Sequence, residues 1–234
     1  MDESEHRIAE AIEMTRVVRA PRQHLATFGV TNVSYYLVTD PSYRELVPSP
    51  QEESVVRQGR VVAQRPALVT PTYMLNLEGF GEHARRYMES LAQRYGPHSP
   101  GILYGYRNEP HGLEIVGGGV SAVAQRISVD LDKQSRDAAT VILGADDLWD
   151  VSLLKFIFEY TSSSLASNVS EMQAMGLLEP DPTTQVPQGV IRRIEELFRQ
   201  VEQGLDANVL KRELDRWGLF EHYEARFLGL FRRR

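Results

Sequence analysis

TVILGADDLWDVSLLKFIFEY, residues 140–160, is the stretch of sequence that decides the fold class. Its first four residues are β-branched or aliphatic and predict a short strand, whereas residues 147–160 have helical spacing. Strand patterns occur repeatedly before this point, and the patterns after it are helical. The sequence therefore predicts an α+β protein with an all-helical C-terminal third.

Upstream of this stretch, strand and helix patterns alternate. β-branched and aromatic runs predict the strands, and apolar residues recurring at three and four predict the helices. In chain order these are a strand at 67–75, a helix at 80–95, strands at 102–106 and 113–116 joined by a turn through 108–112, a helix at 120–131 and a strand at 140–143. This βαββαβ order is that of a ferredoxin-like sandwich, which we expect as the core.

A helix and a hairpin are expected to extend this core at its N-terminal side. Residues 4–19 have helical spacing, and their first turns are acidic, as the helix dipole favours. VSYYLV, residues 33–38, predicts a strand. VVRQGRVVA, residues 55–63, predicts a hairpin that turns at Gln58 and Gly59.

The region after residue 146 predicts helices interrupted by one proline-rich linker. EPDPTTQVPQG, residues 179–189, lies between a short helical pattern at 168–176 and the amphipathic patterns of the last 45 or so residues. We therefore expect three regions. These are residues 1–30 (N-terminal helix and connector), 31–145 (α+β domain) and 146–234 (helical region with its linker at 179–189).

Composition excludes several classes of protein. The 234 residues include no cysteine, so disulfides, thiolate metal sites and cysteine nucleophiles are ruled out. A net charge of -6 disfavours non-specific nucleic-acid binding, for which phosphate neutralisation supplies the affinity. The acidic start of the chain is unlike a secretory signal, and no apolar run approaches the length of a membrane span. We expect a cytoplasmic protein with no membrane partner.

Asp146, Asp147 and Asp150 form the sharpest local motif. Carboxylates at this DDxxD spacing can share a magnesium ion that holds a pyrophosphate. The five residues resemble the aspartate-rich motif of isoprenyl diphosphate and terpene synthases, although those families have a large all-helical fold and a second metal-binding motif. The alternative is that Asp146 or Asp147 caps the helix that follows.

Gly117, Gly118 and Gly119 lie between a predicted strand and a predicted helix. Glycines at such a position let backbone N–H groups approach a phosphate at the helix N-terminus. The triplet matches neither the phosphate-loop signature nor the dinucleotide-binding fingerprint. A tight strand-to-helix turn is the alternative interpretation.

The C-terminal helices are rich in aromatic residues of the kind that anchor protein interfaces, namely Trp217, Phe220, Tyr223, Phe227 and Phe231. We therefore hypothesise a non-catalytic interaction or regulatory protein, in which these helices mediate self-association or bind a protein partner. The same side chains are equally typical of an internal core. The alternative function is magnesium-dependent binding or turnover of a phosphorylated small molecule through the glycine triplet and the aspartates.

Overall fold

A computed structural model describes residues 3–45, 52–77 and 81–232. The chain divides into two compact units, each built from two separate stretches of sequence. Unit 1 comprises Met1–Arg65 and Tyr104–Val169, and unit 2 comprises Pro66–Leu103 and Ser170–Arg234. Part of unit 2 is therefore inserted in the sequence of unit 1.

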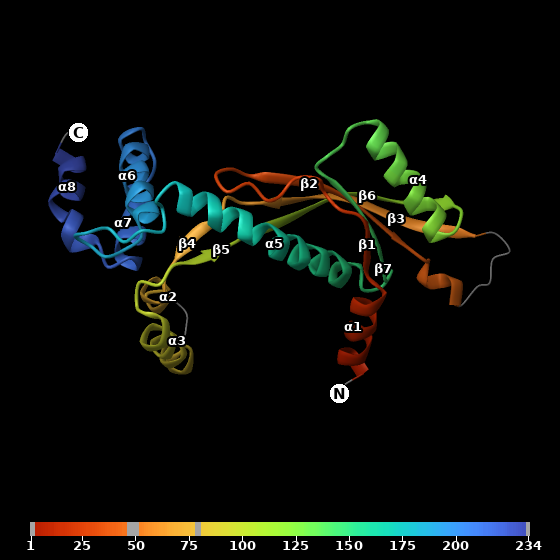
Figure 1. Ribbon diagram of the computed structural model, residues 1–234, viewed down its shortest axis with the longest axis horizontal. Coiled ribbons are helices and arrows are strands. Elements are labelled where there is room, and N and C mark those ends of the chain that lie inside the picture. Colours follow the sequence, from red (N-terminus) through yellow and green to blue (C-terminus); the bar gives the residue numbers. More distant parts are fainter. Residues whose placement is uncertain (1–2, 46–51, 78–80, 233–234) are drawn as a thin grey trace. The chain divides into compact units, whose positions relative to one another are not determined.

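Unit 1 is built on a five-stranded mixed sheet with the strand order β1-β7-β2-β3-β6 (Figure 1). The strands are β1 (Arg16–Arg19), β2 (Thr31–Thr39), β3 (Glu53–Ala63), β6 (Tyr106–Gly117) and β7 (Ala139–Gly144). The central neighbours β2 and β7 run parallel, and every other neighbouring pair is antiparallel. Both central strands are rich in β-branched residues, which suit a strand that is covered on two faces.

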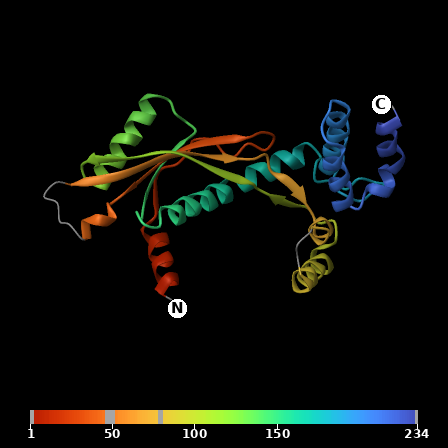
Figure 2. The ribbon, with the colours of Figure 1, turned by 180° about the vertical axis from the view of Figure 1, so that it is seen from behind.

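Helices cover the two faces of this sheet, with α4 (Val120–Lys133) on one side and α5 (Trp149–Ala174) on the other (Figures 1 and 2). Alternate residues of the strands feed the two resulting cores. The core under α4 contains Val38, Val56, Val123, Ala124, Leu131, Ala139 and Val141. The core under α5 contains Leu25, Val33, Tyr35, Leu37, Val61, Ala63, Ile142, Leu153, Phe156 and Tyr160.

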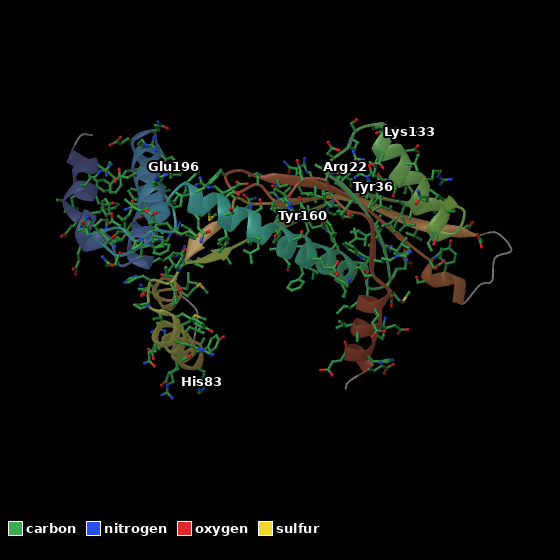
Figure 3. All side chains as sticks on the ribbon, viewed as in Figure 1. Arg22, Tyr36, His83, Lys133, Tyr160 and Glu196 are labelled. Carbon is green, nitrogen blue, oxygen red and sulfur yellow. The ribbon has the colours of Figure 1, made fainter. Side chains whose placement is uncertain are left out.

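Two tyrosines labelled in Figure 3 mark these faces: Tyr160 belongs to the core under α5, and Tyr36 packs against the core under α4. The Tyr160 hydroxyl donates a hydrogen bond of 2.7 Å to the Gln23 carbonyl. Burial, with a smaller contribution from Tyr106, raises the pKa of Tyr160 to about 12. The phenol therefore stays protonated at neutral pH and serves as a donor inside the core.

The N-terminal helix α1 (Glu3–Met14) leads directly into β1 and is tied to α5. Thr15, which is buried, donates from its hydroxyl to the Ala11 carbonyl at 2.6 Å and lies 2.8 Å from the Ser152 hydroxyl. The short helix η1 (Ser42–Glu45) follows β2.

Unit 2 is mainly helical and has one small two-stranded antiparallel sheet. That sheet pairs β4 (Ala67–Val69) with β5 (Gly101–Leu103). The helices are α2 (Pro71–Leu75), α3 (Glu82–Tyr95), α6 (Gln188–Glu202), α7 (Ala207–Arg216) and α8 (Phe220–Arg232). The core of unit 2 gathers Val186, Val190, Ile194, Leu197, Phe198, Val201, Leu210, Leu214, Trp217, Leu219 and Phe227.

The predicted fold class is confirmed, because the chain combines a mixed sheet with helices and its C-terminal third is helical. The ferredoxin-like core is not confirmed. Two of its expected strands, β4 and β5, pair with each other in unit 2 and take no part in the five-stranded sheet. None of the helices in the described residues is long and apolar enough to cross a membrane.

Two expected turns are replaced by continuous strands. β3 runs through Gln58 and Gly59, where the sequence predicted a hairpin, because this glycine faces a buried tyrosine ring and does not form a turn. β6 runs through residues 108–112. Gln58 pairs with Gly112 and Gly59 with Pro110, so the turn signals around His111 produce a β-bulge.

Two expected elements also change type partway along. Residues 71–75 form α2 and not a strand, because Thr70 caps the helix by accepting a 3.2 Å hydrogen bond from the Tyr73 N–H and Pro71 occupies the first turn. Residues 16–19 form β1 and not the end of a helix. Val17 pairs with Ile142 of β7, and Val18 packs against the core under α4.

Gly59→Ala tests the contact between β2 and β3. An added Cβ would lie 2.7 Å from Cε1 of Tyr35, whose side chain is 1% exposed and has no room to move. We expect a loss of about 1–3 kcal/mol in the free energy of unfolding, measured by urea denaturation. Gly112→Ala is the control, because nothing lies within 4 Å of its added Cβ. Equal stability of the two variants would contradict the packing described.

Candidate functional site

Asp146, which follows β7, is held by groups from β2, β3 and the segment after β2. Its carboxylate accepts hydrogen bonds from the Thr39 hydroxyl at 2.9 Å and from the Ser42 N–H at 3.0 Å. It also forms an ion pair with Arg57 of β3. Arg57 in turn lies over the Trp149 ring, 6.0 Å from its centroid, at the start of α5.

The pKa of Asp146 lies below its usual range. Burial acts in the opposite direction, since it disfavours the charged form, but the Ser42 N–H, Arg57 and Thr39 together outweigh it. The side chains of Asp146 and Arg57 are 11% and 19% exposed. Asp146 is thus an ionised carboxylate whose charge is balanced by Arg57 and whose oxygens are already bonded within unit 1.

Asp147 and Asp150, the other members of the motif, have different surroundings. Asp147 is half exposed and pairs with Arg7 of α1. Asp150 is exposed and accepts a 2.9 Å hydrogen bond from the Val151 N–H. In the described residues, no three histidine, aspartate or glutamate side chains are grouped closely enough to hold a metal ion. The magnesium site stays a prediction that draws no support from this arrangement.

A pocket of about 580 Å³ lies at the carboxyl ends of the parallel strands β2 and β7. Its lining comes from α1, from residues 40–42 and from residues 144–148. Charged groups of both signs face it, among them Arg7, Glu10, Asp40 and Asp147. Carboxyl ends of parallel strands are where open sheets bind ligands, so the fold brings two of the predicted aspartates to a place suited to binding.

The glycine triplet forms the turn between β6 and α4. Gly118 has a positive φ of 115°, its N–H donates to the Glu52 carbonyl at 2.7 Å, and its own carbonyl accepts from the Ser54 hydroxyl at 2.7 Å. A Cβ added to Gly119, the residue before α4, would lie 2.9 Å from a carboxylate oxygen of Glu52. A carboxylate of the protein thus lies beside this helix N-terminus and would repel a phosphate. Phosphate binding by Gly117, Gly118 and Gly119 stays a prediction.

The aromatic residues of the C-terminal helices mostly pack inside unit 2. Trp217 and Phe227 are buried, and Phe220 and Tyr223 are partly buried against the same core. The Trp217 ring lies 4.6 Å from that of Tyr73, between ring centroids. Phe231, at 55% exposed, is the one with a free face. An interface role for the group stays a prediction, and its internal packing is the finding.

An apolar surface that the sequence reasoning missed lies on α5. The face of α5 turned to the sheet buries Leu153 and Phe156, whereas Leu154 and Phe158 are 63% and 72% exposed. Leu165 is 43% exposed and lies about two turns further along the same side of the helix. The signal in the sequence is that apolar residues surround this helix on more than one face.

The edge strand β6 also has exposed apolar side chains. Leu113 and Ile115 are 53% and 55% exposed. Leu113 pairs with Arg57 across the sheet and so points to the α5 side, where Arg57 meets Trp149. Further along β6, the Tyr106 hydroxyl hydrogen-bonds Thr161, which lies one turn from Phe158. We call Leu113, Ile115, Leu154, Phe158 and Leu165 together the α5–β6 surface.

Asp146→Asn tests the contribution of the ion pair between Asp146 and Arg57 to stability. At pH 7 we expect the free energy of unfolding to fall by about 2–4 kcal/mol, since Arg57 would lose its counter-charge in a largely buried position. Asp147→Asn is the matched control, because this exposed pair with Arg7 contributes less than about 1 kcal/mol.

The pH dependence of the two proteins should also differ. A carboxylate whose pKa is lowered by folding stabilises the protein above its unfolded pKa of about 3.9, and this stabilisation is lost as the pH falls through the lower folded value. The gap in stability between wild type and Asp146→Asn should therefore close in acid. Chemical denaturation over a pH series measures this difference in the free energy of unfolding. A difference that persists unchanged at low pH would contradict the stabilising role of the ion pair.

Comparison with known proteins adds no assignment to this geometry. No protein-family model, curated protein or solved structure matches the chain.

Proposed function

We propose that this protein is a non-catalytic interaction protein and that it associates with a second copy of itself through the α5–β6 surface. The observation that carries the proposal is Phe158, which is 72% exposed on a helix whose opposite face already packs in the core of unit 1. Several exposed apolar side chains on one side of a protein mark interaction sites more often than single scattered ones do.

The edge of the sheet supports the same proposal. β6 is the last strand in the order, and β3 is its one partner among the described strands. One side of β6 thus presents backbone N–H and C=O groups with no strand beside them, which is a template for adding another strand. In a two-fold symmetric dimer, β6 would pair with β6 of the second copy, and the apolar side chains of both copies would lie on the same side of the joined sheet.

The aromatic C-terminal helices offer the competing surface. Trp217 and Phe227 are buried in unit 2. The exposed large apolar residues of α8 are Leu228, at 46% exposed, and Phe231, at 55% exposed. These two residues are fewer than the five of the α5–β6 surface. Because α8 is a helix, it also offers no strand edge to which a second copy could add a strand. A different protein partner would bind the same α5–β6 surface. Self-association is the form of the proposal that the purified protein alone can test.

Phe158→Glu tests the proposal, with Phe231→Glu as the matched control on α8. Burying a phenylalanine contributes about 2 kcal/mol, and a symmetric dimer contains two copies of it. We therefore expect Phe158→Glu to weaken self-association by at least tenfold, on the order of 1.4 kcal/mol, without loss of stability. Sedimentation velocity over a concentration series measures the association, and circular dichroism checks the fold.

Phe231→Glu should leave association unchanged. The opposite result, in which Phe231→Glu dissociates the protein and Phe158→Glu does not, would place the interface on α8. A wild-type protein that stays monomeric over the whole concentration series would contradict self-association.

A further inference from the structure

Unit 2 contains a basic pocket formed by the end of α2, by α3 and by α7. Its volume is about 340 Å³, and it is lined by Leu75, Asn76, Leu77, Arg85, Arg212, Asp215 and Arg216. His83, labelled in Figure 3, marks the first turn of α3, from which Arg85 also projects. Arg212 and Arg216 are one turn apart on α7 and so share a face of that helix.

Contacts between α2 and α7 hold the pocket in shape. The Asn76 side-chain amide donates to the Arg216 carbonyl at 3.0 Å, which joins the end of α2 to the end of α7. The Tyr73 and Trp217 rings pack nearby, with centroids 4.6 Å apart. The arginines on α7 are thus presented by an anchored helix and not by a loose segment.

Among the described residues that line the pocket, three are arginines and one is an aspartate. The Asp215 carboxylate forms an ion pair with Lys211, whose ammonium lies 2.6 Å from both carboxylate oxygens. Arg216 donates to Glu213 at 2.9 Å. Arg85 and Arg212 have no acidic or hydrogen-bonding partner for their side chains within residues 3–45, 52–77 and 81–232. Among the described residues, two guanidinium groups at the pocket therefore have no carboxylate partner, in a protein whose net charge is -6.

Guanidinium groups match the geometry of phosphate oxygens, which they bind through paired N–H donors. A pocket of this volume is at the small end of the range for small-molecule sites, large enough for a phosphate and a short organic group. Leu75 and Leu77 supply an apolar wall for that group. We infer that this pocket binds the phosphate group of a small phosphorylated molecule, with Arg85 and Arg212 as its principal ligands.

The test uses the full chain and isothermal titration calorimetry with inorganic phosphate and pyrophosphate as probes. We expect saturable binding of pyrophosphate at one site per chain, and a loss in affinity of at least about tenfold in Arg85→Gln and in Arg212→Gln. Both arginines are exposed, so the variants should fold normally, which thermal unfolding checks. Arg126→Gln, an equal change of charge at an exposed position on α4 of unit 1, is the control and should bind as the wild type does.

Three results would overturn the inference. The first is the absence of saturable binding of either probe to the wild type at millimolar concentration. The second is an equal loss of affinity in Arg126→Gln, which would show that only overall charge matters. The third comes from vesicles containing phosphatidic acid, a second source of phosphate groups: binding to such vesicles without binding of pyrophosphate would replace the soluble ligand by a lipid headgroup.

Discussion

The parallel pairing of β2 with β7 is the contact on which the rest of unit 1 depends. These two strands occupy the middle of the sheet, and Leu37 and Val141 in them are completely buried. Parallel neighbours need a crossover, and here the chain between them supplies two further strands of the sheet, the inserted part of unit 2 and α4. Because the strands run the same way, the segments that leave them meet at one edge, and there Asp146 binds Thr39, Ser42 and Arg57.

The same arrangement explains where apolar surface is left over. α4 and α5 cover the central strands, whereas β6 at the edge is mostly exposed and pairs only with β3 among the described strands. α5 packs one face on the sheet and still presents Leu154 and Phe158 outward. Burial of these side chains would stabilise an assembly but does not contribute to the folding of unit 1, and for this reason the surface supports an interaction function better than a structural one.

Arginines serve different purposes in the two units. In unit 1, Arg19 and Arg57 are largely buried and are paired with Asp132 and Asp146, so they hold the fold together. In unit 2, Arg85 and Arg212 are exposed at a pocket and form no ion pair within the described residues, because Asp215, which also lines the pocket, is paired with Lys211. The chain has a net negative charge, yet three of the four charged side chains that line this pocket in the described residues are arginines.

Local patterns in the sequence determined the class of the fold and many of its elements. Helical spacing after residue 146, the β-branched run of β2 and the signals for α4 and β7 are properties of neighbouring residues. β2, α4 and β7 formed close to their expected places, whereas the helical patterns at 147–160 and 168–176 form one continuous helix, α5. Tertiary structure decided which strands share a sheet, that Gly59 lies under Tyr35 within a strand, and that Trp217 and Phe227 are core while Phe158 is surface. It also decided that Arg85, from the inserted stretch, joins Arg212 at one pocket. Spacing along a chain reports which residues share a face of one element, but burial and charge balance depend on what packs against that face, and in this protein the packing partners come from distant parts of the sequence.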